Sequence, residues 1–186
     1  MAQEKVSCFY PDLLRPIDKS GLERLSEKGK ENPNALVTLK ARTVCEGQFR
    51  NLTYIRDLPP HVIDEPPHLL GEDTAPNPSE ALLAALGACL SVGIHANATA
   101  RGIALSTLEL TLEGDINVTA VWGVGDLSPD KRLGFSAIRV NVTAEGNAAP
   151  DVLADIVDHA NKWSPVANTL RNAVTVEVFP ASHRGI

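Results

Sequence analysis

One stretch of the sequence limits the fold more than any other: Asn-Pro-Ser-Glu at residues 77–80, followed by an apolar run over 81–94. Asparagine is a favoured helix N-cap, proline suits the first helical position, and a glutamate three residues after the cap can bond back to the cap's N–H. The run carries leucines at three- and four-residue steps, with small residues on its other sides. We therefore predict a capped, buried helix that ends near Arg101-Gly102 and holds one thiol, Cys89.

The composition and charge of the chain narrow its class. With 186 residues, 44% of them apolar, it has enough core for one globular domain. A net charge of -6 argues against nucleic acid or a membrane as a partner. The apolar run is shorter than a membrane span, and no signal peptide is evident. We therefore expect a cytoplasmic protein.

The number and spacing of the cysteines argue against two kinds of structure. Cys8, Cys45 and Cys89 are odd in number and far apart in the sequence. This spacing argues against a set of disulfides and against a zinc site. We expect neither a metal nor another cofactor.

The remaining periodicities give an order of elements. Alternating residues predict strands at 35–45, 48–56, 105–121, 135–144 and 173–179. A turn at Glu46-Gly47 would join the first two strands, and a polar loop is expected over 123–131. The proline-rich segment 57–76 predicts a loop with a short strand near 62–63. Amphipathic segments predict helices at 18–30, 150–163 and 164–170. Strands that follow each other without a helix between them favour antiparallel pairing, so the fold class is α+β. Residues 1–34 would be an N-terminal extension with a short helix, and 35–186 one domain.

Three short motifs carry a family resemblance: Asn-Pro-x-Glu-x-Leu-Leu-Ala-Ala-x-Gly-Ala-Cys at 77–89, Ala-Arg-Gly-Ile at 100–103, and Ser-Pro-Val-x-x-Thr-Leu at 164–170. Together they resemble the OsmC-like family, which includes osmotically inducible protein C and the organic hydroperoxide resistance proteins. The resemblance covers roughly residues 35–180. It implies an OsmC-like fold, in which antiparallel sheets wrap around two long central helices in an intertwined homodimer. It also implies a thiol peroxidase site at the dimer interface.

In that family, one cysteine on the long helix attacks the peroxide, and a second, at the start of the later short helix, resolves the sulfenic acid as a disulfide. Cys89 matches the attacking position. The resolving position falls on Ser164, which cannot form a disulfide.

The resemblance also implies an arginine from the first hairpin and a glutamate near the start of the long helix, which together hold the thiolate. Arg50 is the preferred arginine because it follows the turn, although Arg42 and Arg56 remain open. The family's glutamate position holds Ser79 here, and Glu80 lies one residue later, about 100° further around the helix. The expected site is therefore Cys89, Arg50 and Glu80.

Two functions follow from these residues. The first is a hydroperoxide reductase, or a related thiol-redox protein, in which Cys89 is reduced again by an external thiol or by Cys45. The alternative is a non-catalytic protein that binds an apolar small molecule in the dimer-interface pocket. The sequence leaves open whether the chain is an enzyme, because a thiol in an apolar helix stays inert unless a cation lies close to it. The role of Cys8 is open as well.

Overall fold

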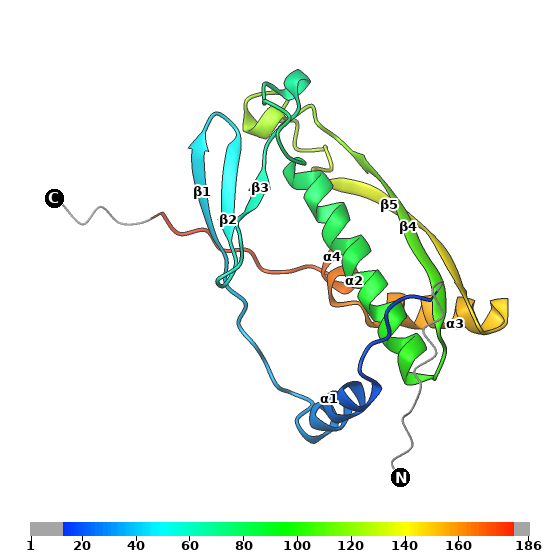
Figure 1. The fold of residues 1–186 in the computed structure, drawn as a ribbon. Coiled ribbons are helices and arrows are strands. Elements are labelled where there is room, and N and C mark those ends of the chain that lie inside the picture. Colours follow the sequence, from blue (N-terminus) through cyan, green and yellow to red (C-terminus); the bar gives the residue numbers. More distant parts are fainter. Residues whose placement is uncertain (1–12, 181–186) are drawn as a thin grey trace, which may run out of the picture.

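The long helix α2 (Pro78–Ala100) is the centre of the computed structural model, which describes residues 13–180 (Figure 1). Its length and composition alone would let it cross a membrane. It packs, however, against a β-hairpin and three helices. These elements are β4 (Leu105–Ile116), β5 (Phe135–Gly146), α1 (Lys19–Glu31), α3 (Pro150–Trp163) and α4 (Pro165–Arg171).

The sequence at the start of α2 forms the predicted cap. The Asn77 side chain accepts a hydrogen bond from the backbone N–H of Glu80, and the Glu80 carboxylate accepts one from the N–H of Asn77, at 2.8 Å each. At the other end, Arg101 is the C-cap and Gly102 has the positive φ (+73°) that a residue after a helix often needs. The predicted helix and its boundaries are therefore confirmed.

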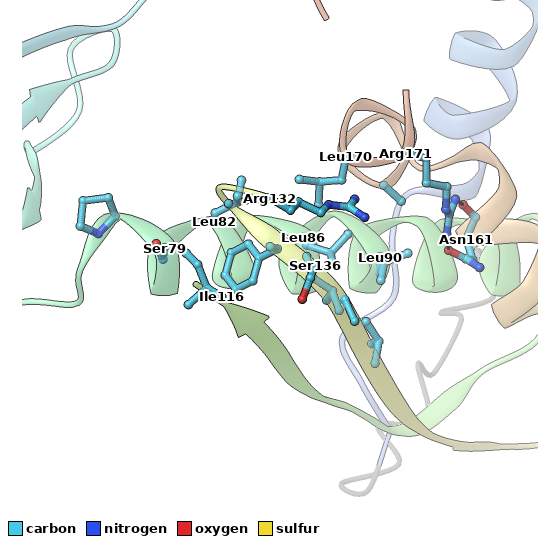
Figure 2. Close-up of a pocket in the computed structure, with 17 residues that line it drawn as sticks. Ser79, Leu82, Leu86, Leu90, Ile116, Arg132, Ser136, Asn161, Leu170 and Arg171 are labelled. Carbon is cyan, nitrogen blue, oxygen red and sulfur yellow. Dashed lines mark hydrogen bonds between the residues drawn. The ribbon is translucent and has the colours of Figure 1, made fainter. Parts of the chain in front are cut away.

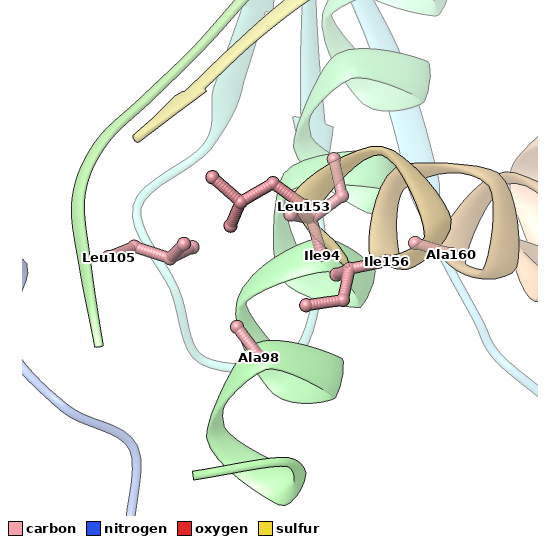
Figure 3. Close-up of a cluster of buried hydrophobic side chains, with 6 residues drawn as sticks. All are labelled: Ile94, Ala98, Leu105, Leu153, Ile156 and Ala160. Atoms are coloured by element: carbon pink, nitrogen blue, oxygen red, sulfur yellow. The ribbon is translucent and has the colours of Figure 1, made fainter. Parts of the chain in front are cut away.

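The hydrophobic core lies where α2 crosses α3 and the β4–β5 hairpin. A first cluster of six buried side chains joins these elements: Ile94, Ala98, Leu105, Leu153, Ile156 and Ala160 (Figure 3). A second, smaller cluster lies nearer the start of α2, where Leu86 and Leu90 meet Ala167 of α4. The core is thus made of aliphatic side chains.

A second sheet is formed by β1 (Arg42–Gly47), β2 (Arg50–Tyr54) and β3 (His61–Ile63), which pair antiparallel in that order. None of its strand residues is buried. A sheet of this size normally needs one covered face to be stable. Two short 3-10 turns, η1 (Pro67–Leu69) and η2 (Val121–Gly123), lie in the loops after β3 and β4.

In the described chain, the predicted strand 35–45 is confirmed only in its second half, and the predicted strand 173–179 is wrong. Residues 35–41 do not pair, and β1 begins only at Arg42, which lies opposite Tyr54 near the end of β2. Residues 173–179 are extended but unpaired, and they run from α4 toward the side of the β1–β3 sheet (Figure 1). Their alternating pattern is that of a strand, but residues 13–180 offer them no neighbouring strand.

The other differences are at boundaries. The hairpin turn lies at Gln48-Phe49 rather than at Glu46-Gly47. Strand β4 ends at Ile116 because Asn117 begins a turn, in which its side-chain oxygen accepts from the N–H and hydroxyl of Thr119. Helix α1 confirms the short helix in the predicted extension, while the domain boundary at residue 34 stays a prediction.

Candidate thiol site

Cys89 and Ser164 lie side by side, although 75 positions separate them in the sequence. The distance between Cys89 Sγ and Ser164 Oγ is 3.1 Å. Cys89 lies nearly three turns into α2, and Ser164 lies between α3 and α4. Ser164 is buried, with 3% of its surface exposed, and Cys89 is half-buried. The thiol therefore faces the start of α4.

Small residues bring the two helices close enough for this contact. A Cβ atom on Gly93 would lie 3.3 Å from the Cβ of Ala160, which is a tight contact. Gly93 follows Cys89 by one helical turn, and Ser164 follows Ala160 by one turn. The two pairs thus form successive steps along the antiparallel crossing of α2 and α3.

Ser164 is held in place by the junction between its two helices. It is the N-cap of α4, where its side-chain oxygen accepts from the N–H of Ala167 at 3.1 Å, and Pro165 occupies the first helical position. The Asn168 side chain donates to the carbonyls of Ser164 and Lys162, at 2.8 and 2.9 Å. The predicted cap-then-proline start of this helix is confirmed.

Arg50 is tied to the loop that leads into α2. Its guanidinium donates to Glu46 at 2.9 Å and to the Thr74 hydroxyl at 2.6 Å. The Thr74 hydroxyl and backbone N–H in turn donate to the buried Asp64 carboxylate. These bonds lower the pKa of Asp64 from 3.8 to about 2, with the Thr74 hydroxyl as the main cause.

The structure brings Cys89 to Ser164 but not to the other predicted site residues. Within residues 13–180, no hydrogen bond or ion pair joins Cys89 to Arg50 or Glu80. Glu80 belongs to the helix cap, and Arg42 stacks 4.4 Å above the Tyr54 ring. The roles of Arg50 and Glu80 toward the thiol stay predictions.

Of the other two cysteines, Cys45 lies within the described residues 13–180, where no hydrogen bond joins it to Cys89 or Ser164. Cys45 is exposed on β1, where its thiol lies 3.9 Å from the carbonyl of Gln48. Cys8 lies outside the described residues. Within residues 13–180, no cluster of three His, Cys, Asp or Glu side chains could hold a metal ion.

A cavity of about 460 Å³ with one apolar wall lies between α2, β5 and α4 (Figure 2). Its lining includes Leu90, which follows Cys89, and Ala167, whose N–H donates to Ser164. Leu82, Leu86 and Leu90 of α2 form one wall, opposite Phe135 and Ile138 of β5. Cys89 is not part of its lining. Because each residue turns a helix by about 100°, Cys89 projects from the face next to that of Leu90.

Two arginines at this cavity are not among the predicted site residues. Arg132 comes from the loop before β5, and Arg171, the last residue of α4, donates to Asn161 (Figure 2). Neither lies in a motif or a periodic segment, so no pattern in the sequence could have linked them to α2.

Comparisons with known proteins identify the family and the fold of this chain. The sequence profile of the family described as OsmC-like protein matches residues 71–179, which is more than half of the chain. The chain belongs to the OsmC-like family. The match runs from the loop before α2 through Cys89 and Ser164 to the unpaired C-terminal segment. A comparison with curated proteins finds no significant match.

Solved structures share the fold of this OsmC-like chain at low identity. An OsmC-like protein from Mycoplasma pneumoniae is 18% identical with a TM-score of 0.62, and covers 74% of this chain and 89% of its own. An organic hydroperoxide resistance protein OsmC from Legionella pneumophila, described as a predicted redox protein, is 24% identical with a TM-score of 0.53. The match covers 74% of this chain and 92% of the Legionella protein. A putative organic hydroperoxide resistance protein from Vibrio cholerae, with captopril bound in one of its active sites, is 21% identical with a TM-score of 0.53. The match covers 75% of this chain and 90% of the Vibrio protein.

These likenesses establish the α+β OsmC-like fold that the motifs indicated. They place the chain in a family that includes predicted redox and hydroperoxide resistance proteins.

Proposed function

We propose that this protein is a hydroperoxide reductase that works with one cysteine, Cys89, and an external thiol. The observation that carries the proposal is the contact between Cys89 Sγ and Ser164 Oγ at 3.1 Å. A serine at this position leaves an oxidised Cys89 without an adjacent thiol. The names of the Legionella and Vibrio relatives support hydroperoxides as the oxidant.

The proposed reaction has three balanced steps. The Cys89 thiolate attacks the terminal oxygen of the hydroperoxide; the O–O bond breaks, and with one proton the products are Cys89 sulfenic acid and an alcohol. An external thiol then attacks the sulfenic sulfur, which releases water and leaves a mixed disulfide. A second external thiol reduces this disulfide and restores Cys89. A reducing cytoplasm would supply such thiols.

The proposal includes a homodimer, and unpaired apolar segments support it. In residues 35–41, Leu36 and Leu39 are at least 90% exposed, and in 173–179, Val176 and Val178 are more than 80% exposed. An extended apolar segment with free backbone groups is a template for strand pairing. A second copy of the chain would offer both segments the partners that one copy does not.

The proposed dimer would also stabilise the Cys89 thiolate. A cation close to the sulfur favours the thiolate of a half-buried cysteine. In the single chain, Arg50 bonds to Glu46 and Thr74 instead. We therefore assign to the assembled dimer the supply of an arginine to Cys89, with Arg50 as the candidate and Glu80 as its neighbouring carboxylate.

A peroxide titration with mass spectrometry tests the function. With cumene hydroperoxide, Cys89 should become sulfenic acid that a dione reagent traps, and Cys89→Ala should abolish turnover with an external dithiol. Cys45→Ser separates the two routes of reduction: unchanged turnover supports the external thiol, and loss of turnover assigns the step to Cys45. If Cys89 stays reduced while Cys8 and Cys45 oxidise, the proposal is wrong.

A second candidate is a binding protein that uses the cavity beside α2. The cavity of about 460 Å³ is large enough for a small molecule, and its leucine wall suits an apolar one. Cys89 is not part of its lining, so Cys89→Ala should leave binding of an apolar fluorescent probe unchanged. Probe binding together with an unreactive Cys89 would favour this candidate over the reductase.

A further inference from the structure

We propose that Ser164 is a positioning residue for Cys89: its hydroxyl donates a hydrogen bond to the sulfur and favours the thiolate. This inference rests on the proposed function for its purpose, although the hydrogen bond itself can be tested without any peroxide. Ser164 would then contribute to the first step of the reaction, the attack on the hydroperoxide, instead of resolving the sulfenic acid.

The direction of the bond follows from the hydrogens available. A serine hydroxyl has one hydrogen and two lone pairs. One lone pair of Ser164 accepts the N–H of Ala167 at 3.1 Å. In the described chain, Cys89 Sγ is the one remaining hydrogen-bond partner of this oxygen. The hydroxyl hydrogen therefore has one acceptor to point at, the sulfur.

The opposite direction would leave a buried donor unpaired. If the Cys89 thiol donated to Ser164, the serine oxygen would accept two hydrogen bonds and its own hydrogen would have no partner. Ser164 is only 3% exposed, so water does not offer an easy substitute. A buried polar hydrogen without a partner is costly, which favours donation from the serine.

Donation to the sulfur changes its chemistry. A hydrogen bond to the charged form of a group favours that form, so this bond favours the thiolate. The N–H of Ala167 donates to the Ser164 hydroxyl, which donates to Cys89 Sγ, so the two successive hydrogen bonds polarise each other. Asn168 also donates to the carbonyl of Ser164, which helps to hold the backbone of this residue in place.

The test measures the reactivity of Cys89 alone. In a full-length Cys8→Ser, Cys45→Ser background, the rate of alkylation by iodoacetamide is measured against pH, together with a thermal melt. Ser164→Gly removes the hydroxyl but keeps a residue that caps helices nearly as well. Ser164→Thr keeps both the hydroxyl and the cap. Thr169→Val is the matched control, because it removes a hydroxyl bond within α4 (to the Pro165 carbonyl, 2.9 Å) far from the thiol contact.

We expect Ser164→Gly to move the midpoint of the pH profile up by about one unit and to slow alkylation at pH 7 about tenfold, the effect of one hydrogen bond to a charged group. Ser164→Thr and Thr169→Val should keep the parent profile. Identical profiles for Ser164→Gly and its parent would overturn the inference, even if Cys89 reacts with hydroperoxide. A shifted profile in a protein that hydroperoxide does not oxidise would overturn the reductase and leave this inference standing.

Discussion

Gly93 of α2 lies against Ala160 of α3 so closely that a Cβ atom on the glycine would be 3.3 Å from the Cβ of Ala160. One turn back along α2 from Gly93 and one turn forward from Ala160 at the end of α3, Cys89 and Ser164 lie 3.1 Å apart. The close helix crossing thus sets the distance between the two side chains of the thiol site.

A larger residue at the crossing should therefore affect both stability and the thiol. Gly93→Val places a branched side chain against Ala160 and should destabilise the fold by about 1–3 kcal/mol. It should also slow alkylation of Cys89 by separating it from Ser164. Urea unfolding and the alkylation rate measure the two effects. Gly29→Ala, in the exposed helix α1 with no atom within 4 Å of the new Cβ, is the control and should be neutral or slightly stabilising.

A second cysteine at position 164 should restore the pair that the sequence lacks. The Sγ–Oγ distance of 3.1 Å is short enough for a small side-chain rotation to reach the S–S length of about 2.05 Å. Ser164→Cys should form a disulfide with Cys89 after one equivalent of peroxide, seen as a loss of two hydrogens by mass spectrometry. Thr169→Cys, on the exposed side of α4, should remain uncrosslinked. A reduced Cys89 in oxidised Ser164→Cys would contradict the observed contact.

The predicted role of Arg50 can be separated from that of its neighbours on the hairpin. Arg50→Ala should slow oxidation of Cys89 by hydroperoxide at least about tenfold, because the thiolate loses a charged partner. Arg50→Lys should retain part of the rate. Arg42→Ala and Arg56→Ala, measured by the same stopped-flow assay, should stay near the wild-type rate. A slow Arg42→Ala or Arg56→Ala with a normal Arg50→Ala would reassign the role.

The Asp64 carboxylate should make stability depend on pH in acid. Its folded pKa of about 2 lies below the ordinary 3.8, so its contribution is present above 3.8 and is lost as the pH falls toward 2. Asp64→Asn should lower Tm at pH 7, and the difference from wild type should shrink between pH 4 and pH 2. Asp57→Asn, at an exposed position, should show no such trend. A constant difference across this range would contradict the assignment to Asp64.

The proposed dimer should depend on one face of the C-terminal segment. Val174, Val176 and Val178 alternate with polar residues and are more than half exposed in the single chain. Val176→Glu should therefore shift light-scattering mass from two 19.9 kDa chains toward one. Thr175→Glu adds the same charge to the opposite face and should remain dimeric. A wild-type protein that runs as a monomer would contradict the proposal.

Local patterns allowed most of the helices and the β4–β5 hairpin to be predicted. Capping residues and apolar spacing act within one element, so the sequence near Asn77 and near Ser164 was enough to place α2 and α4. The first part of the predicted strand 35–45 and the whole strand 173–179 were predicted wrongly for the single chain, because strand pairing requires a neighbour. An alternating pattern describes the faces of a strand but not its partner.

The sequence by itself determined the family, the α+β class and the position of one thiol on a capped helix. Only the tertiary structure decided what that thiol faces, because Cys89 and Ser164 meet through a helix crossing that depends on the small residues Gly93 and Ala160. The tertiary structure also places the Arg50 guanidinium against the Thr74 hydroxyl within the single chain. These contacts join residues far apart in the sequence, and so they follow from how whole elements pack rather than from any local pattern.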